Sequence, residues 1–289
     1  MKSSRLRMPD FIAVGPARTG TTWLHESLRD HVCLPRIKEI HFFKWHYSNG
    51  LRWYAQHFRN CSRSLPVGEI CPSYFNFVPA RERILNDLPN CKIICTLRDP
   101  VERIYSHYKM MRPLWGTSAS FEEALVEYPD LIDASCYATH VKAWQDAFGQ
   151  SRVLILFYDD LKSNPQSYLD TACSFIGIPK IDLNQTRIGA RKTNEATRLP
   201  RSRRLALASS LVLERLRSRR FDLIVDIWQR SGLWKMCVGG GKKYGPISPE
   251  TEARLREHFQ AGVEDLERLT GRNLCAWKQT EVKPAKAGA

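Results

Sequence analysis

Short runs of uninterrupted apolar residues alternate along the chain with longer segments of mixed polarity. Four runs predict strands, at residues 11–14 (FIAV), 67–71 (VGEIC), 91–97 (CKIICTL) and 152–158 (RVLILFY). Strands that are apolar throughout and are separated by helices favour a parallel sheet covered on both faces. The expected fold class is therefore α/β, a single domain with a central parallel β-sheet flanked by helices and with a helical C-terminal portion.

Helices are expected between and after these strands. The pattern predicts helices at 22–30, at 137–149, at 164–178 and from Ser248-Pro249 onward. A further helix is expected to end within residues 84–90 (ILNDLPN). Asn164 and Ser248 are N-cap residues followed by a proline at the first helical position. Residues 200–235 have the pattern of one or two Arg-rich amphipathic helices, and the glycines of 238–246 (VGGGKKYGP) predict a flexible loop.

The chain of 289 residues is long enough for one large domain. We expect an N-terminal tail at 1–9, one domain at 10–277 with the Arg-rich helical insert at about 198–235, and a disordered tail at 278–289. No window approaches ~18 uninterrupted apolar residues, and FIAV is too short for a signal peptide. The nine cysteines are an odd number without a CxxC pair, which favours a reducing compartment. The expected location is the cytoplasm.

The net charge of +14 indicates acidic ligands or surfaces. Residues 198–220 contain eight arginines and one acidic residue, Glu214. Such a stretch either binds a polyanion or an anionic membrane surface, or is simply a solvated helical face. Peripheral membrane contact would involve 198–235, and no specific nucleic acid is expected.

Residues 11–23 (FIAVGPARTGTTW) predict a strand, a tight glycine-containing turn and a helix N-terminus. Backbone N–H groups and the helix dipole at such a turn point toward an anion. The Gly15-x4-Gly20 spacing is that of a nucleotide P-loop, but the lysine that should follow Gly20 is Thr21, and the cation of the loop is Arg18. The fold is thus expected to be P-loop-like without the Mg-ATP chemistry. The candidate phosphate-binding residues are Arg18, Thr19, Gly20, Thr21 and Thr22, while Trp23 either stacks on a base or packs in the core.

Residues 96–108 (TLRDPVERIYSHY) predict a second phosphate site. Arg98 ends a buried strand, Asp99-Pro100 begins a helix, and Ser106 lies two turns further on. A guanidinium and a hydroxyl are both good phosphate donors, so Arg98 and Ser106 are candidates to hold a phosphate together. Asp99 either caps the helix or acts as a Walker-B-like Mg²⁺ ligand, and the missing P-loop lysine disfavours the second interpretation.

Two further segments have candidate chemistry. In KEIHFFKW (38–45), polar groups alternate with aromatic ones, and Glu39 is a candidate general base with His41 to support it or to orient a substrate. An ordinary surface pair is the alternative. In GGGKKYG (239–245), Lys242 and Lys243 are placed to close over a phosphate, unless the segment is a solvated linker.

In this order, the four segments resemble the sulfotransferases that use 3′-phosphoadenosine 5′-phosphosulfate (PAPS), in particular the heparan-sulfate type and its bacterial relatives. The resemblance extends from about Pro9 to Trp277. It implies that GPARTGTTWL binds the 5′-phosphosulfate, that Arg98 and Ser106 bind the 3′-phosphate, and that Glu39 is the catalytic base. The residues implied near the nucleotide at the C-terminal loop are Lys242, Lys243, Tyr244 and Gly245.

Three positions depart from the heparan-sulfate pattern. The loop cation is Arg18 rather than lysine, which keeps the charge but changes its reach. Lys44 stands where an aspartate follows HFF, and Ile70 stands where EKTPAYF has its lysine. In those enzymes the last two positions lie on the side that binds the acceptor. The residues expected to bind the donor therefore keep the family pattern, whereas the resemblance does not identify the acceptor.

The resulting hypothesis is transfer of a sulfuryl group from PAPS to a hydroxyl of a saccharide or of a glycosylated or small metabolite. Transfer would be in line, with Glu39 taking the acceptor proton, Arg18 and His41 assisting, and no metal required. One alternative is a nucleotide-dependent small-molecule kinase, which Thr21 disfavours. The other is a polyanion-binding or membrane-surface-binding protein that uses the arginines of 198–220.

Overall fold

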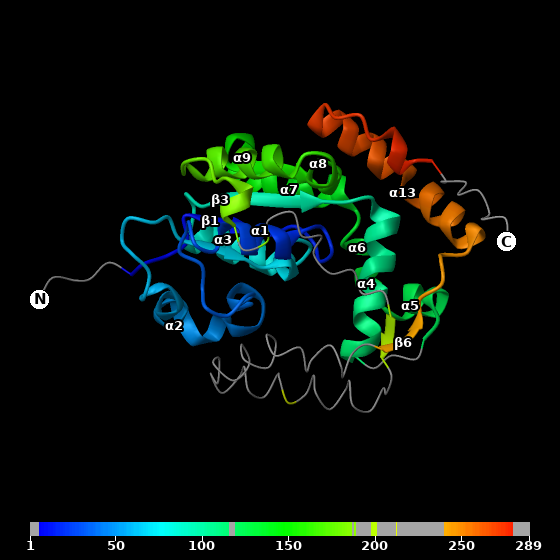
Figure 1. Ribbon diagram of the computed structural model, residues 1–289, viewed down its shortest axis with the longest axis horizontal. Coiled ribbons are helices and arrows are strands. Elements are labelled where there is room, and N and C mark those ends of the chain that lie inside the picture. The colour runs from blue at the N-terminus through cyan, green and yellow to red at the C-terminus, as the bar shows by residue number, and fades with distance from the viewer. Residues whose placement is uncertain are drawn as a thin grey trace, which may run out of the picture.

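The computed structural model describes residues 6–115, 119–186, 188, 198–200, 212 and 240–279. Its centre is a four-stranded parallel sheet of order β2-β1-β3-β4 (Figure 1). The strands are β1 (Phe11–Ala13), β2 (Gly68–Ile70), β3 (Lys92–Leu97) and β4 (Val153–Phe157). All four predicted strands are present, and the expected α/β class is confirmed.

Alternate residues of the central strands point into two separate cores. Ile12 and Ile93 belong to the core under α2 (Gly50–Ala55), α3 (Val78–Asp87), α4 (Pro100–Trp115), α7 (Tyr137–Phe148) and α13 (Pro249–Thr270). Phe11 and Ile94 belong to the core under α1 (Thr21–Leu28), α8 (Tyr158–Ser163) and α9 (Pro165–Ile176). Because successive strand side chains face opposite ways, a strand apolar throughout must be covered on both faces.

The predicted helix starts at Asn164 and Ser248 are confirmed. The side chain of Asn164 accepts a hydrogen bond from the Ser167 backbone N–H, and that of Ser248 accepts one from Thr251. Between α4 and α7 lie α5 (Phe121–Glu127) and α6 (Asp130–Asp133). A short π-helical segment, η1 (Phe42–His46), precedes α2, and a 3₁₀ turn, η4 (Pro72–Tyr74), follows β2.

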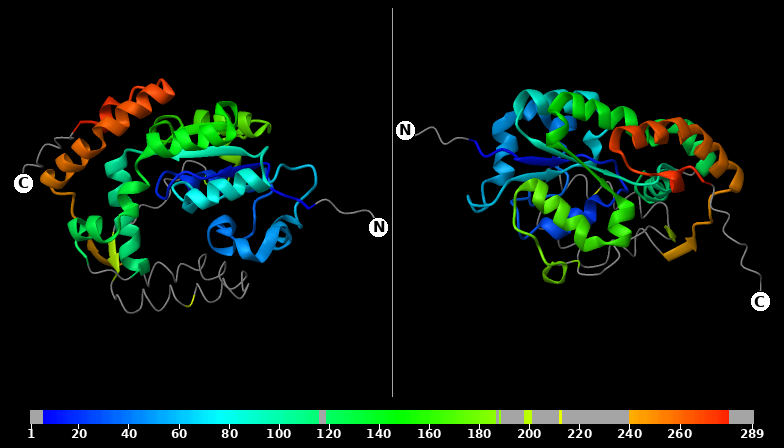
Figure 2. Two further views of the ribbon diagram at one scale, coloured as in Figure 1. Left: turned by 180° about the vertical axis from the view of Figure 1, so that it is seen from behind. Right: turned by 90° about the horizontal axis from the view of Figure 1, so that it is seen from above.

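Helix α4 begins where β3 ends and runs away from the sheet, with α13 beside it (Figures 1 and 2). Helix α13 also packs against α7. The C-terminal helix is therefore joined to the helix that carries the second predicted phosphate motif.

The predicted loop at 238–246 is partly a strand. β6 (Gly240–Lys243) pairs antiparallel with β5 (Arg198–Pro200), so backbone hydrogen bonds order this glycine-rich segment despite its composition. The Arg-rich helices expected at 200–235 lie outside the described residues apart from positions 200 and 212. Of the expected tails at 1–9 and 278–289, residues 1–5 and 280–289 also lie outside the described part of the chain.

A disulfide joins Cys33 and Cys61. The expectation of reduced cysteines was wrong for this pair, because the fold brings together two cysteines that are 28 residues apart in the sequence. Disulfides are rare in the cytosol, so the cysteine argument for a cytoplasmic location falls. None of the helices in the described ranges combines the length and the apolar character needed to cross a bilayer.

Candidate functional site

The loop after β1 is fixed against β3. A Cβ at Gly15 would lie 2.1 Å from Thr96 Oγ1, so only glycine allows this approach. The Thr19 hydroxyl donates to the Pro16 carbonyl oxygen at 2.6 Å and lies 2.6 Å from Thr96 Oγ1. These contacts hold the loop against β3.

The N-terminus of α1 fits an anion. Its N-cap is Gly20, with φ 96°, which has no side chain to bind the first N–H groups of the helix. The first turn contains no acidic residue. Free backbone N–H groups and the positive end of the helix dipole are what a phosphate needs.

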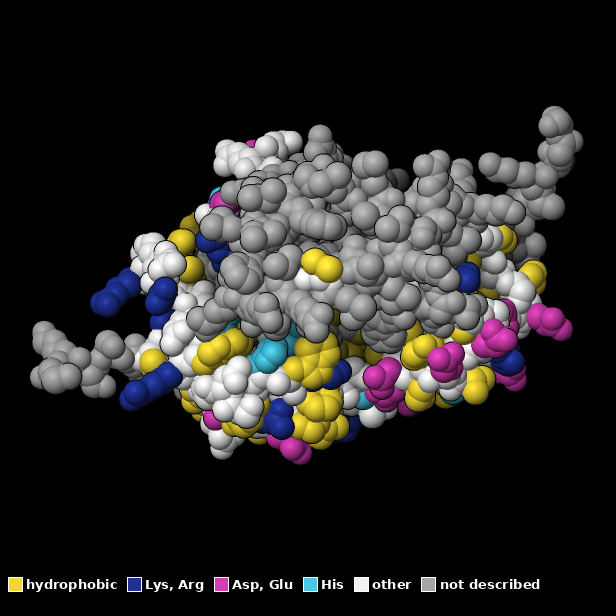
Figure 3. Space-filling view, turned by 90° about the horizontal axis from the view of Figure 1, so that it is seen from below, with side chains coloured by type: hydrophobic (Ala, Val, Ile, Leu, Met, Phe, Trp, Pro, Cys, Tyr) yellow, Lys and Arg dark blue, Asp and Glu magenta, His cyan; other side chains and the backbone are white. Residues whose placement is uncertain are grey.

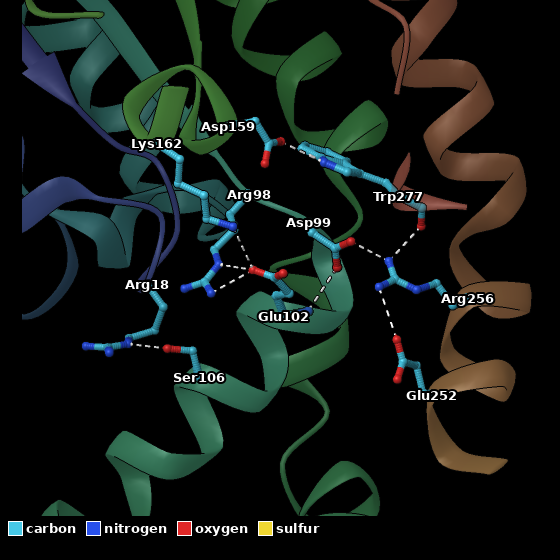
Figure 4. A network of polar contacts seen from close by, with 10 residues as sticks. All are labelled: Arg18, Arg98, Asp99, Glu102, Ser106, Asp159, Lys162, Glu252, Arg256 and Trp277. Atoms are coloured by element: carbon cyan, nitrogen blue, oxygen red, sulfur yellow. Dashed lines mark hydrogen bonds and ion pairs between the residues drawn. The ribbon is translucent and has the colours of Figure 1, made fainter. Parts of the chain in front are cut away.

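Arg18 connects the two predicted phosphate motifs. Its Nε donates to Ser106 Oγ of α4 at 2.9 Å, and Ser106 is buried (Figure 4). Arg18 has φ 79°, a left-handed conformation that costs a residue with a Cβ roughly 1–3 kcal/mol. The loop thus directs its one predicted cation toward the α4 motif at the expense of backbone strain.

Arg98 forms an ion pair with Glu102. Its Nε and Nη2 donate to Glu102 Oε2 at 3.1 and 2.7 Å, and its guanidinium lies 4.7 Å from the centre of the Tyr158 ring. Lys162 Nζ approaches the same Glu102 oxygen at 3.3 Å. A phosphate bound by Arg98 would therefore compete with Glu102, and Ser106 reaches it from the Arg18 side rather than as a direct partner of Arg98.

Asp99 is a capping residue. Its Oδ1 accepts the Glu102 backbone N–H at 2.9 Å, which confirms the capping interpretation over the Mg²⁺-ligand one. Its Oδ2 forms a buried ion pair with Arg256 of α13, which also donates to the Trp277 carbonyl oxygen at 2.8 Å. The acid that follows Arg98 thereby holds the C-terminal helix in place.

The segment that contains Glu39 lies against the phosphate loop. Lys38 Nζ contacts Thr22 Oγ1 of α1 at 2.7 Å and Glu39 Oε1 at 2.9 Å. Glu39 Oε2 lies 3.9 Å from His41 Nε2, and His41 Nδ1 lies 2.8 Å from Ser73 Oγ. Both Glu39 and His41 have left-handed backbone conformations, with φ 64° and 56°. The carboxylate and the imidazole therefore form a defined cluster, although each comes from a loop.

Trp23 packs in the core. Its side chain is buried and meets Tyr168 of α9 edge-on, with ring centres 5.7 Å apart. The structure thus favours core packing over the alternative of stacking on a base.

The C-terminal loop is held on α4. Tyr244 donates to the Lys109 carbonyl oxygen at 3.1 Å, and Tyr105 donates to that of Gly245. The backbone of Lys242 and Lys243 belongs to β6, while their side chains lie outside the described part of the chain. The segment therefore lies beside the helix that bears Ser106.

Sequence reasoning missed Lys38, Ser73 and Tyr158 as contributors. Lys38 could have been found from the sequence, because it directly precedes the candidate base Glu39. Tyr158 and Ser73 come from other elements, and only the fold brings them to Arg98 and His41.

The family model described as the sulfotransferase domain matches residues 8–205. The chain belongs to the sulfotransferase family. The expected resemblance is confirmed, and with it the class of enzyme.

Similar proteins include the bifunctional heparan sulfate N-deacetylase/N-sulfotransferase 1 of Mus musculus, 30% identical over 309 residues, 96% of this chain and 31% of that protein. The membrane-associated sulfotransferase kil1 of Dictyostelium discoideum is 35% identical over 161 residues, 51% of this chain and 33% of that protein. This sulfotransferase chain spans about a third of each of these relatives.

The crystal structure of a sulfotransferase from Alicyclobacillus acidocaldarius has a TM-score of 0.66 and 21% sequence identity, and covers 94% of this chain and 99% of that one. At this identity the likeness concerns the fold alone. It agrees with the parallel sheet and flanking helices described above.

Proposed function

We propose that this sulfotransferase moves a sulfuryl group from PAPS to a hydroxyl of a saccharide or of a glycosylated or small metabolite, with Glu39 as the general base. The observation that carries the proposal is the contact of Lys38 with both Thr22 and Glu39. It places a carboxylate beside the N-terminus of the helix that follows the phosphate loop. An acceptor hydroxyl bound there would lie between a base and an anion site.

The donor side of the proposal rests on residues that fit a nucleotide with two phosphate groups. The loop from Gly15 to Thr22 would bind the 5′-phosphosulfate through backbone N–H groups. Ser106 and Arg98 would bind the 3′-phosphate, and Arg18 lies between the two positions. Lys242 and Lys243 would close over the nucleotide, with Tyr244 and Gly245 holding that loop on α4.

PAPS supplies a sulfuryl group on a phosphate leaving group. The bond that forms joins the acceptor oxygen to sulfur, and the bond that breaks joins sulfur to the 5′-phosphate oxygen. Glu39 takes the acceptor proton, and Arg18 neutralises charge that develops on the leaving oxygen. Lys38 Nζ lies 2.9 Å from Glu39 Oε1, and His41 Nε2 lies 3.9 Å from Glu39 Oε2. Positioning by the Lys38 and Arg18 charges would support transfer without a metal ion.

The acceptor side is more open. One of the relatives named above is a heparan sulfate N-deacetylase/N-sulfotransferase, so an amine belongs in the acceptor screen beside hydroxyls. Trp45 is 58% exposed and lies over His41, with ring centres 4.2 Å apart. An exposed aromatic ring beside the candidate base is a surface on which a sugar ring can lie. We further propose that the functional domain extends over 10–277.

Thermal unfolding tests the donor site. The protein is heated with 3′,5′-adenosine bisphosphate, with AMP or with Mg-ATP, each in excess. A ligand at 100 times its Kd adds about 2.7 kcal/mol to the free energy of unfolding. A large shift with the bisphosphate and a small one with AMP is the expected result. A shift with Mg-ATP alone would contradict the proposal and favour a kinase.

Glu39→Gln tests the base. Transfer from PAPS to a screened acceptor should fall by a factor of ~10²–10⁴, with the Kd for the bisphosphate unchanged. Glu82→Gln, an exposed glutamate on α3, is the matched control and should retain full activity. Equal activity of both variants would show that Glu39 is not the base.

A further inference from the structure

Glu102 lies between the two residues expected to bind the 3′-phosphate. Arg98 directly follows β3, and Glu102 and Ser106 come next at intervals of four residues, both on α4. Residues four apart lie on one face of a helix, so Glu102 and Ser106 share a face of α4. A carboxylate on that face would repel a phosphate, so its presence at an anion site needs a physical reason.

One oxygen of Glu102 has the surroundings of a bound phosphate oxygen. Glu102 Oε2 accepts from Arg98 Nε at 3.1 Å, from Arg98 Nη2 at 2.7 Å and from Lys162 Nζ at 3.3 Å (Figure 4). Burial raises the pKa of Glu102, but the charges and hydrogen bonds of Arg98 and Lys162 lower it by more, so the carboxylate is ionised at neutral pH. Charged N–H donors that converge on one oxygen are also what binds a phosphate.

Lys162 reaches this place from another part of the chain. It lies on α8, and its Nζ is 5.2 Å from the centre of the Tyr158 ring, while the Arg98 guanidinium is 4.7 Å from the same centre. Helix α8 also lies against the phosphate loop, because a Cβ at Gly20 would be 3.0 Å from Leu161 Cδ2 and 3.2 Å from Tyr158 Cδ2. Lys162 thus brings a second cation to the junction of the phosphate loop and α4.

The carboxylate is the part of this cluster that can move. The side chain of Arg98 is 10% exposed, whereas those of Glu102 and Lys162 are 39% and 48% exposed. An ion pair at such an exposed carboxylate contributes little net free energy. Glu102 can therefore turn into solvent at small cost while the Arg98 guanidinium keeps its place.

We propose that Glu102 competes with the nucleotide 3′-phosphate for one anion site, and that Lys162 belongs to this site together with Arg98. The inference rests on the proposed function and adds to it a ligand, Lys162, and an internal competitor, Glu102. A phosphate monoester carries a charge of about −1.5 to −2 at pH 7, more than one carboxylate, so two cations favour the phosphate. AMP has no 3′-phosphate and gains nothing from this site.

Lys162→Met is the first experiment. Calorimetry gives the Kd of 3′,5′-adenosine bisphosphate and of AMP for the variant and the wild type. We expect the bisphosphate Kd to rise about tenfold, the effect of one hydrogen bond between charged groups, and the AMP Kd to stay the same. Lys142→Met is the matched control, because Lys142 is an exposed lysine of α7 in an ion pair with Asp146. An unchanged ratio of the two Kd values in Lys162→Met would overturn the inference.

Glu102→Gln is the second experiment, and its expected effect has the opposite sign. The amide keeps the size of the side chain and removes the competing charge, so the bisphosphate Kd should fall about three- to fivefold, with the AMP Kd unchanged. Asp146→Asn, at the exposed partner of Lys142, is the matched control. A higher bisphosphate Kd in Glu102→Gln would show that Glu102 holds Arg98 in place for the nucleotide, and the competition would be overturned.

The double variant separates two ways in which Lys162 could act. If Lys162 binds the phosphate directly, Lys162→Met should raise the bisphosphate Kd about tenfold in the Glu102→Gln background as well. If Lys162 acts only by neutralising Glu102, its effect should vanish in that background. The second result would remove Lys162 from the site.

The two proposals fail in different ways. A wild type that binds the bisphosphate no better than AMP would contradict the proposed donor site and, with it, this inference. A wild type that prefers the bisphosphate, with the same preference in Lys162→Met and Glu102→Gln, would overturn only the roles of these two residues.

Discussion

Arg18 combines backbone strain with the position of the loop cation. Arg18→Ala should lower kcat by a factor of ~10²–10³, the usual effect of removing one group that stabilises charge in a transition state. Arg18→Lys keeps the charge and should retain more activity. Steady-state kinetics with PAPS, and bisphosphate binding by calorimetry, separate the effect on the reaction from that on affinity.

The strain gives the same residue a second readout. Arg18→Gly removes the Cβ that disfavours φ 79°. The free energy of unfolding of the glycine variant should therefore be between zero and about 1 kcal/mol higher than that of Arg18→Ala. Both variants should be equally inactive. A less stable glycine variant would show that the Arg18 backbone is not strained.

Single residues were predictable where their role depends on neighbours in sequence. The helix that begins at about Thr22 and Asp99 as a cap follow from local chemistry; the helix begins at Thr21, and Asp99 caps α4. The phosphate motif alone did not predict that Arg98 forms an ion pair with Glu102. The hydrogen bonds of buried Glu69 could not be predicted, because its donors Tyr54 and Tyr74 come from separate parts of the chain.

A buried ion pair, Asp99 with Arg256, links the start of α4 to α13. Arg256→Met removes one partner and leaves Asp99 buried without its counter-charge, which costs about 3–5 kcal/mol of stability. Arg254→Met is the matched control, because Arg254 is exposed on the same helix and should change stability by less than about 0.5 kcal/mol. Urea unfolding of the two variants tests this, and equal losses would contradict it.

The disulfide closes the loop that contains Lys38, Glu39 and His41. For a loop of this length, reduction should lower the free energy of unfolding by about 3–4 kcal/mol in the chain-entropy description. Denaturant midpoints of the protein with and without dithiothreitol measure the loss. The Cys33→Ala/Cys61→Ala variant should have the same low stability with and without dithiothreitol. If dithiothreitol does not change the denaturant midpoint of the wild type, the disulfide contributes nothing to stability.

Helices and strands were predictable from the sequence where apolar residues recur with a clear helical or strand pattern. The four strands and the helices from Asn164 and Ser248 were found because packing and capping agree with the local pattern. β6 was missed because three consecutive glycines have no strand pattern, and its order comes from the pairing with β5. The disulfide was missed because cysteine spacing does not report distance in space.

The charge of the molecule was predictable in amount but not in arrangement. On the face shown in Figure 3, acidic side chains gather toward one end, and Lys and Arg are more numerous toward the other. A net charge of +14 predicts affinity for acidic ligands in general. The motifs already single out Arg18 and Arg98 as candidate phosphate ligands, whereas only the fold adds Lys38, whose Nζ lies 2.7 Å from Thr22 Oγ1.

Stability as a function of pH belongs to the whole molecule, because groups of opposite sign contribute. Burial lowers the pKa of His107 to about 3, with the Arg103 and Arg18 charges adding to it. An unfolded histidine has a pKa near 6.5, so between about pH 6.5 and 3 only the unfolded chain binds this proton. Stability from His107 is therefore lost as the pH falls, by about 2 kcal/mol between pH 7 and 5.

Glu69 acts in the opposite direction. Its pKa is raised to about 7, so the folded protein binds that proton more tightly than the unfolded chain and gains stability as the pH falls. The contributions of His107 and Glu69 largely cancel in the wild type, so its free energy of unfolding should change little between pH 7 and 5. Urea unfolding of His107→Gln at pH 7 and 5 separates them: this variant should gain about 2 kcal/mol relative to the wild type on going to pH 5. His258→Gln, an exposed histidine on α13, should follow the wild type, and a His107→Gln profile parallel to it would show that His107 is protonated equally in both states.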